Sequence, residues 1–121
     1  MSSDEAFTAQ HGRALIIARH NAALIREWAK GMDYAGLGAD LMRRYAVERA
    51  FILIAEAIKD VPLDLLNATA PHVPWRKITG FRNFLAHTYE DLPDERIMLT
   101  INKELPIMME AIADILERTP L

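Results

Sequence analysis

The chain has 121 residues, of which 51% are hydrophobic and 26% are charged, so its composition is that of a globular protein and excludes a disordered tail. We expect a single domain over residues 1–121. The formal net charge of −3 argues against extended binding to nucleic-acid phosphates, but it leaves room for a small basic site in one chain or across two. The absence of cysteine excludes disulfides and thiolate chemistry.

The N-terminal residues and the apolar runs indicate where in the cell the protein is located. Residues 1–10 (MSSDEAFTAQ) are polar and acidic and lack the basic and then apolar order of a secretory signal. The longest apolar runs, such as AFILIA, are far too short to span a bilayer. We therefore expect a cytoplasmic protein that does not bind a membrane.

The spacing of apolar residues predicts a first helix from about Ser3 to Lys30. Residues 31–38 (GMDYAGLG) contain three glycines, which indicates a turn or a loose connection. A second helix is expected from Ala39 to Lys59, with a wide apolar stripe that requires more than one neighbour. A loop with one short helical turn at residues 63–66 then leads to Pro74.

A third helix is expected to begin at Pro74 or Trp75, because proline is well placed in a first turn. A fourth helix begins after residues 90–95 (EDLPDE) and runs to about Arg118, and Pro106 should kink or interrupt it. No segment shows the sustained alternation that a sheet needs. The sequence therefore predicts an all-α protein, a four- to five-helix up-and-down bundle.

The third helix carries a continuous polar arc. At 100° per residue the arc runs through Tyr89, Arg82, Ala86, Asn83 and His87, and its middle member is small. Asn83 and His87 are neighbours at i, i+4, whereas Arg82 and His87 are five residues apart and point in different directions. A two-fold dimer that lays two such helices side by side could bring Arg82 of one chain and His87 of the other to one phosphate. The alternative is the solvated face of an amphipathic helix, since short motifs carry a high false-positive risk.

The spacing of Arg82, His87 and Tyr89 resembles the R-x-x-x-x-H-x-Y signature of the HEPN superfamily and, more narrowly, of the HepT-like toxins. The whole segment Pro74–Asp91 (PWRKITGFRNFLAHTYED) is similar to the third helix of that family. Gly80, just before the motif, would also allow another helix to approach closely.

The resemblance extends beyond this helix. Ala46–Val61 (AVERAFILIAEAIKDV) resembles the second helix of the family, and Glu104–Pro106 (ELP) resembles its fourth. About two-thirds of the chain is covered, from roughly Arg44 to Leu116, and the N-terminal helix is similar only in being a helix.

The resemblance implies a compact helical homodimer that cuts RNA without a metal ion or another cofactor. It implies that Arg82 and His87 are the catalytic pair and that Asn83 is a supporting, RNA-binding residue. Transfer RNA is the implied substrate class. The implied partner is a minimal nucleotidyltransferase antitoxin, which neutralises the toxin by direct contact or by attaching AMP to the motif tyrosine, here Tyr89.

These residue types suit cleavage of RNA by its own 2′-hydroxyl. His87 titrates near neutral pH and can act as base or acid, and the Arg82 guanidinium can stabilise the crowded phosphorane. Asn83 could orient the imidazole or donate to a phosphate oxygen. We therefore expect a 2′,3′-cyclic phosphate product and activity that survives EDTA.

Glu56 occupies an acidic position that recurs in the family, and we expect it to be a second supporting, RNA-binding residue without a catalytic role. It either pairs with Lys59 at i, i+3 or reaches Arg82 and fixes its guanidinium.

Three histidines show no metal-binding spacing. Five cations either form a local basic rim for RNA or are simply solvated. The histidines are His11, His20 and His72, and the cations are Arg43, Arg44, Arg49, Arg76 and Lys77.

Three functions remain open from the sequence. The first, which we favour, is a ribonuclease toxin. The second is a HEPN-type module without catalysis that binds RNA or a nucleotide or acts through its partner. The third is a helical interaction protein with a chance motif. An adjacent gene for a small nucleotidyltransferase with a G-S…D-x-D pattern would favour the first.

Overall fold

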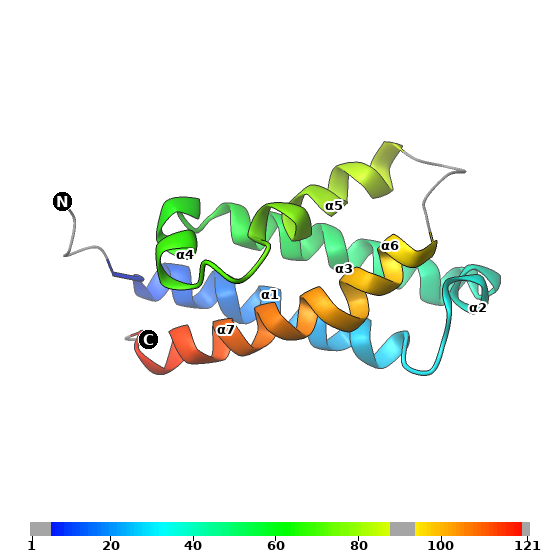
Figure 1. Ribbon diagram of the computed structural model, residues 1–121, viewed down its shortest axis with the longest axis horizontal. Helices are drawn as coiled ribbons and strands as arrows, with labels where there is room; N and C mark the ends of the chain where they lie inside the picture. Colours follow the sequence, from blue (N-terminus) through cyan, green and yellow to red (C-terminus); the bar gives the residue numbers. More distant parts are fainter. Residues whose placement is uncertain (1–5, 88–93, 120–121) are drawn as a thin grey trace.

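The computed structural model describes residues 6–87 and 94–119, and for residues 34, 82–87, 94 and 95 it describes the backbone alone. All regular secondary structure in these ranges is helical, which confirms the predicted all-α class. Figure 1 shows the long helices running side by side as a bundle. In chain order the elements are α1 (Ala9–Trp28), α2 (Tyr34–Ala39), α3 (Leu41–Lys59), α4 (Leu63–Thr69), α5 (Trp75–His87), α6 (Asp94–Leu99), the π-helical segment η1 (Thr100–Glu104) and α7 (Leu105–Glu117).

The first helix begins later than the predicted start at Ser3. Thr8 has extended backbone angles, and its Oγ1 accepts the N–H of His11 at 3.1 Å. The Nδ1 atom of His11 in turn accepts the N–H of Thr8 at 3.1 Å. This reciprocal cap satisfies two N–H groups that a helix start leaves without partners, so α1 begins at Ala9.

The region that was predicted as a loose connection is instead helical, because two aspartates cap helices there. The Oδ1 atom of Asp33 accepts the N–H of Gly36 at 2.7 Å and starts the short helix α2. Asp40 then accepts the N–H of Arg43 at 3.1 Å, so α3 begins at Leu41 and not at Ala39. The predicted short turn after α3 is also longer and forms α4.

The last long helical segment accommodates Pro106 through a change of helix type. The N–H of Leu105 donates to the carbonyl of Thr100, five residues back, at the end of η1. The predicted interruption is therefore a π-helical stretch, and α6, η1 and α7 continue as one segment (Figure 1). Inside this segment the Thr100 hydroxyl bonds to Glu104 Oε1 at 2.9 Å, and Arg96 Nη2 lies 3.7 Å from the same oxygen.

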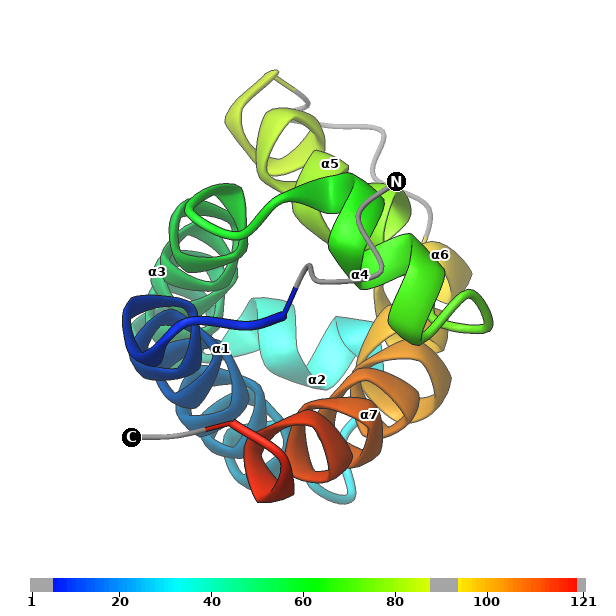
Figure 2. The same cartoon turned by 90° about the vertical axis from the view of Figure 1, so that its left-hand side faces the viewer.

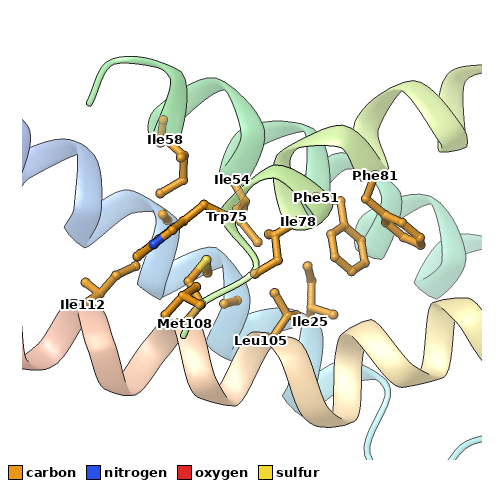
Figure 3. Packing of buried hydrophobic residues seen from close by; sticks show 14 of the residues in the cluster. Ile25, Phe51, Ile54, Ile58, Trp75, Ile78, Phe81, Leu105, Met108 and Ile112 are labelled. Carbon is orange, nitrogen blue, oxygen red and sulfur yellow. The ribbon is translucent and has the colours of Figure 1, made fainter. Parts of the chain in front are cut away.

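One cluster of buried side chains connects the long helices. Trp75 at the start of α5 is 1% exposed, and its Nε1 donates to the carbonyl of Ala70 at 3.1 Å, so this side chain anchors the start of α5 in the core. Figure 3 shows Trp75 between α3 and α7, with Ile58 of α3 and Met108 of α7 nearby. In the end view of Figure 2 the long helices surround the core and α2 lies across its far end, where Leu37 is buried.

Candidate active site

Helix α5 carries three of the predicted site residues. It starts directly after Pro74 and ends at His87. The prediction that Arg82, Asn83 and His87 share one helix is therefore confirmed for the backbone. Their side chains, and all of Tyr89, lie outside what the structure describes, so the contacts of these four residues stay predictions.

The helical repeat places positions 83 and 87 on the same face as two residues from the first half of α5. With 100° per residue, Arg76, Gly80 and positions 83 and 87 fall within about 60° of one another. Arg76 and Gly80 are exposed. This face of α5 therefore lies toward solvent in its first half, and Asn83 and His87 continue it.

Position 82 lies on a different face of α5. It is about 140° around the helix axis from position 87 and falls between the positions of Trp75 and Ile78. Both of those side chains are buried in the core. A single copy of α5 therefore presents positions 82 and 87 in different directions, as the five-residue spacing predicts.

An open groove lies beside the exposed face of α5. It has a volume of about 560 Å³ and runs between the C-terminal half of α3, the start of α4 and the first half of α5. Helices α3 and α5 run antiparallel (Figure 1). The rings of Phe51 in α3 and Phe81 in α5 pack against each other, with their centroids 4.8 Å apart. The polar side chains of the groove belong to Glu56, Lys59 and Arg76, together with Thr79.

Glu56 does not form the ion pair with Lys59 that its spacing allowed. No nitrogen–oxygen contact within 4 Å joins the two, although the side chains of both are described. Both residues are exposed and line the groove together with Arg76. The expected i, i+3 pair is therefore wrong, and the contact between Glu56 and Arg82 stays a prediction.

The five cations that were considered as a basic rim separate into two groups. Arg43 Nε lies 3.6 Å from the Asp40 carboxylate, which caps α3, and Arg44 Nε lies 2.9 Å from the Glu48 carboxylate on α3, so these two charges are partly compensated. The other three, Arg49, Arg76 and Lys77, are exposed. Only Arg76 of the five lines the groove. A basic rim made of all five cations is therefore not what the structure forms.

The histidines outside α5 have different surroundings. His11 caps α1, and His20 and His72 are exposed. In the described part of the chain no group of three or more His, Cys, Asp or Glu side chains is arranged to hold a metal ion. None of the described helices is long and apolar enough to cross a bilayer.

Comparison with protein families decides what kind of chain this is. A family model with the description "Ribonuclease HepT-like" matches residues 18–115, which include α3, α5 and the groove between them. The chain belongs to the HepT-like ribonuclease family. The match begins within α1, so the similarity of this HepT-like chain to its family extends further toward the N-terminus than the predicted start near Arg44.

Curated relatives agree with the HepT-like assignment. A protein of Caldanaerobacter subterraneus subsp. tengcongensis with the description "Putative RNase" is 30% identical over 92 residues, which are 76% of this chain and 81% of the relative. A Methanocaldococcus jannaschii protein with the same description is 32% identical over 82 residues, 68% of this chain and 70% of the relative. A Thermococcus cleftensis protein named "Probable ribonuclease HepT" is 29% identical over 83 residues, 69% and 74% of the two chains. No solved structure matches at the significance that these relatives reach.

Membership of a ribonuclease family implies RNA as the substrate of this HepT-like chain.

The motif could be predicted from the sequence alone, but the groove could not. Lys59 and Arg76 lie 17 positions apart in the sequence and come together only through the antiparallel packing of α3 and α5. The one available signal was the spacing of Arg76, Gly80, Asn83 and His87, which all fall on one helical face.

Proposed function

We propose that this HepT-like chain is a metal-independent endoribonuclease and the toxin of a cytoplasmic toxin–antitoxin pair, with one helical domain over residues 1–121. The observation that carries the proposal is the motif of Arg82, His87 and Tyr89 in a chain whose family match includes α5. Transfer RNA is the proposed substrate class, and it follows from the resemblance of the motif region to the HepT-like toxins.

The proposed reaction is an internal displacement at phosphorus. The 2′-oxygen of one ribose attacks the adjacent phosphate, the bond from phosphorus to the 5′-oxygen breaks, and a 2′,3′-cyclic phosphate and a 5′-hydroxyl result. His87 either takes the proton of the 2′-hydroxyl or supplies the proton of the 5′-oxygen. Arg82 stabilises the charge on the phosphorane through its planar fork of N–H donors, and Asn83 supports the pair.

Cleavage of total RNA by the purified protein tests the catalytic role of His87. His87→Ala should abolish cleavage and leave the helical circular-dichroism signal unchanged, because alanine forms helix at least as well as histidine. His20→Ala, at an exposed position of α1, is the matched control and should cut like wild type. Cleavage by His87→Ala at the wild-type rate would show that the assignment is wrong. RNA binding without any cleavage by wild type would favour the non-catalytic alternative.

The proposed site uses two protomers, because positions 82 and 87 lie on different faces of α5. A homodimer also accounts for three large apolar side chains at the start of α3, Leu41, Met42 and Tyr45, which are 56%, 85% and 62% exposed. The antiparallel packing of α3 and α5 puts them at the end of the bundle where α5 reaches His87.

Mixed dimers test whether the two residues come from different chains. An equal mixture of Arg82→Ala and His87→Ala protomers contains heterodimers in which one of the two sites has both residues intact, if the residues act across the interface. Refolding the mixture should then restore about a quarter of wild-type cleavage, since half of the dimers are mixed and half of their sites are complete. A mixture as inactive as its components would place both residues of each site on one chain.

The proposed regulator is a minimal nucleotidyltransferase antitoxin that binds the toxin or modifies Tyr89. In the modification the tyrosine oxygen attacks the α-phosphate of ATP, pyrophosphate leaves, and an AMP group with one added negative charge remains. That charge would repel RNA phosphate beside the site. Mass spectrometry of the chain after coexpression with its partner should show the mass of an adenylyl group (AMP less one water) added at Tyr89. Inhibition without added mass would indicate direct contact alone.

A further inference from the structure

We propose that the groove between α3 and α5 is an RNA-strand subsite, in which Lys59 and Arg76 hold phosphates that flank the cleaved linkage. The proposal rests on the proposed ribonuclease function and deepens it, because it assigns the contacts that position the substrate. These contacts lie outside the motif.

The charge of the groove fits a phosphodiester strand. Lys59 and Arg76 contribute two cations against the single carboxylate of Glu56, in a chain whose total charge is −3. Both cations are exposed, and neither has an ion-pair partner within 4 Å among the residues whose side chains are described. Unlike Arg43 and Arg44, they are therefore available to a phosphate from outside. A guanidinium suits a phosphate particularly well, because its N–H donors match two phosphate oxygens at once.

The groove is continuous with the helix face that carries the motif. Arg76 and Gly80 share that face with positions 83 and 87. At 1.5 Å per residue, Gly80 lies about 10 Å and Arg76 about 16 Å from position 87 along the helix axis. A strand bound at His87 therefore reaches Arg76 by following α5, without passing around the helix.

The wall of the groove also suits a nucleotide. Apolar side chains between α3 and α4 and at the start of α4 also line the groove, among them Pro62, which is exposed, and Leu63, which is half-buried. They offer an apolar surface to a ribose or a base. On the α5 side, a Cβ added at Gly80 would meet no atom within 4 Å among the side chains that the structure describes and the backbone of other elements, so a strand can approach the helix backbone there.

Binding of an uncleavable RNA analogue tests the subsite. We suggest a fluorescein-labelled 2′-O-methyl oligouridylate of about twelve nucleotides, a length within the range of single-strand sites. The 2′-O-methyl group removes the nucleophile, so the full-length wild-type protein can be used. Arg76→Glu and Lys59→Glu should each weaken binding about fivefold and lower the slope of log Kd against log salt by about 0.7.

A matched control separates the groove from the general charge of the chain. Arg13→Glu makes the same charge change at an exposed position of α1 and should bind the analogue like wild type. Gly80→Leu fills the groove without changing charge and should also weaken binding. Unchanged binding by Arg76→Glu and Lys59→Glu, or an equal loss by Arg13→Glu, would overturn the subsite. So would a loss of antitoxin binding by Arg76→Glu and Lys59→Glu with RNA binding intact.

The result also distinguishes the subsite from the proposed catalysis. A wild-type protein that binds the analogue through Lys59 and Arg76 but never cuts unmodified RNA refutes the nuclease and leaves the subsite in place. A protein that cuts RNA but binds the analogue equally well after Arg76→Glu refutes the subsite alone. A protein that cuts unmodified RNA but does not bind the analogue also refutes the subsite alone, and a protein that neither binds the analogue nor cuts RNA refutes both.

Discussion

Replacing Gly80 by alanine should stabilise the protein. Gly80 lies in the interior of α5, its φ is not positive, and an added Cβ would meet no atom within 4 Å among the described side chains and the backbone of other elements. Glycine inside a helix costs about 0.5–1 kcal/mol relative to alanine, because its backbone loses more freedom on folding. For a chain of 121 residues this gain corresponds to a rise of about 2–4 °C in the melting temperature.

The same substitution at Gly31 should have the opposite effect. An added Cβ at Gly31 also has no heavy atom within 4 Å, but the backbone there has a φ of +75°. Alanine is disfavoured in this left-handed conformation by about 1–2 kcal/mol. Gly31→Ala should therefore lower the free energy of unfolding by about 1 kcal/mol, although the space around both glycines is equally open.

Urea unfolding of wild type, Gly80→Ala and Gly31→Ala at the same protomer concentration measures both effects. The series should be repeated at a second concentration, because the stability of a dimer depends on concentration. A shift of both variants in the same direction, or a Gly80→Ala variant that is less stable than wild type at both concentrations, would contradict the predicted effects of the two glycines. A loss for Gly80→Ala that appears only at the higher concentration would instead indicate that another chain packs against α5 there.

Three further substitutions test the packing and the caps by urea unfolding. Trp75→Phe removes the buried N–H that donates to Ala70 and leaves a small void, so it should cost about 2–3 kcal/mol; a cost below 0.5 kcal/mol would contradict the anchor role. Thr100→Val keeps the side-chain volume but leaves Glu104 without its hydroxyl donor, so it should cost about 1–2 kcal/mol, and an unchanged midpoint would show that this bond adds nothing. Thr8→Ala removes the cap of α1 and should cost about 1 kcal/mol, with increased fraying of the first turn in amide exchange.

The long helices could be predicted from the sequence because their apolar residues repeat at helical spacing. Their ends were less accurate, since they depend on single side chains. Thr8 and Asp40 each accept a backbone N–H and set the starts of α1 and α3, and Asp33 does the same for α2. The glycine content predicted a loose connection before Asp40. The chain there is helical, because Asp33 caps α2 and Leu37 of α2 is buried in the core.

Less of the candidate site than of the fold could be predicted from the sequence. The motif on α5 could be found from spacing and resemblance, because its members lie close together in the chain. The Glu56–Lys59 pair was a reasonable expectation from i, i+3 spacing, but exposed ion pairs add little stability and spacing does not enforce them. The groove required the register of α3 against α5, which the contact between Phe51 and Phe81 sets. No pattern in a single segment contains that register.

The end groups of cleaved transfer RNA test the central claim most directly. Purified wild-type protein, incubated with transfer RNA in excess EDTA, should yield fragments with a 2′,3′-cyclic phosphate at one end and a 5′-hydroxyl at the other. Arg82→Ala and His87→Ala should yield none. Cleavage that stops in EDTA, fragments with a 5′-phosphate, or undiminished cleavage by both variants would contradict metal-independent catalysis by this pair.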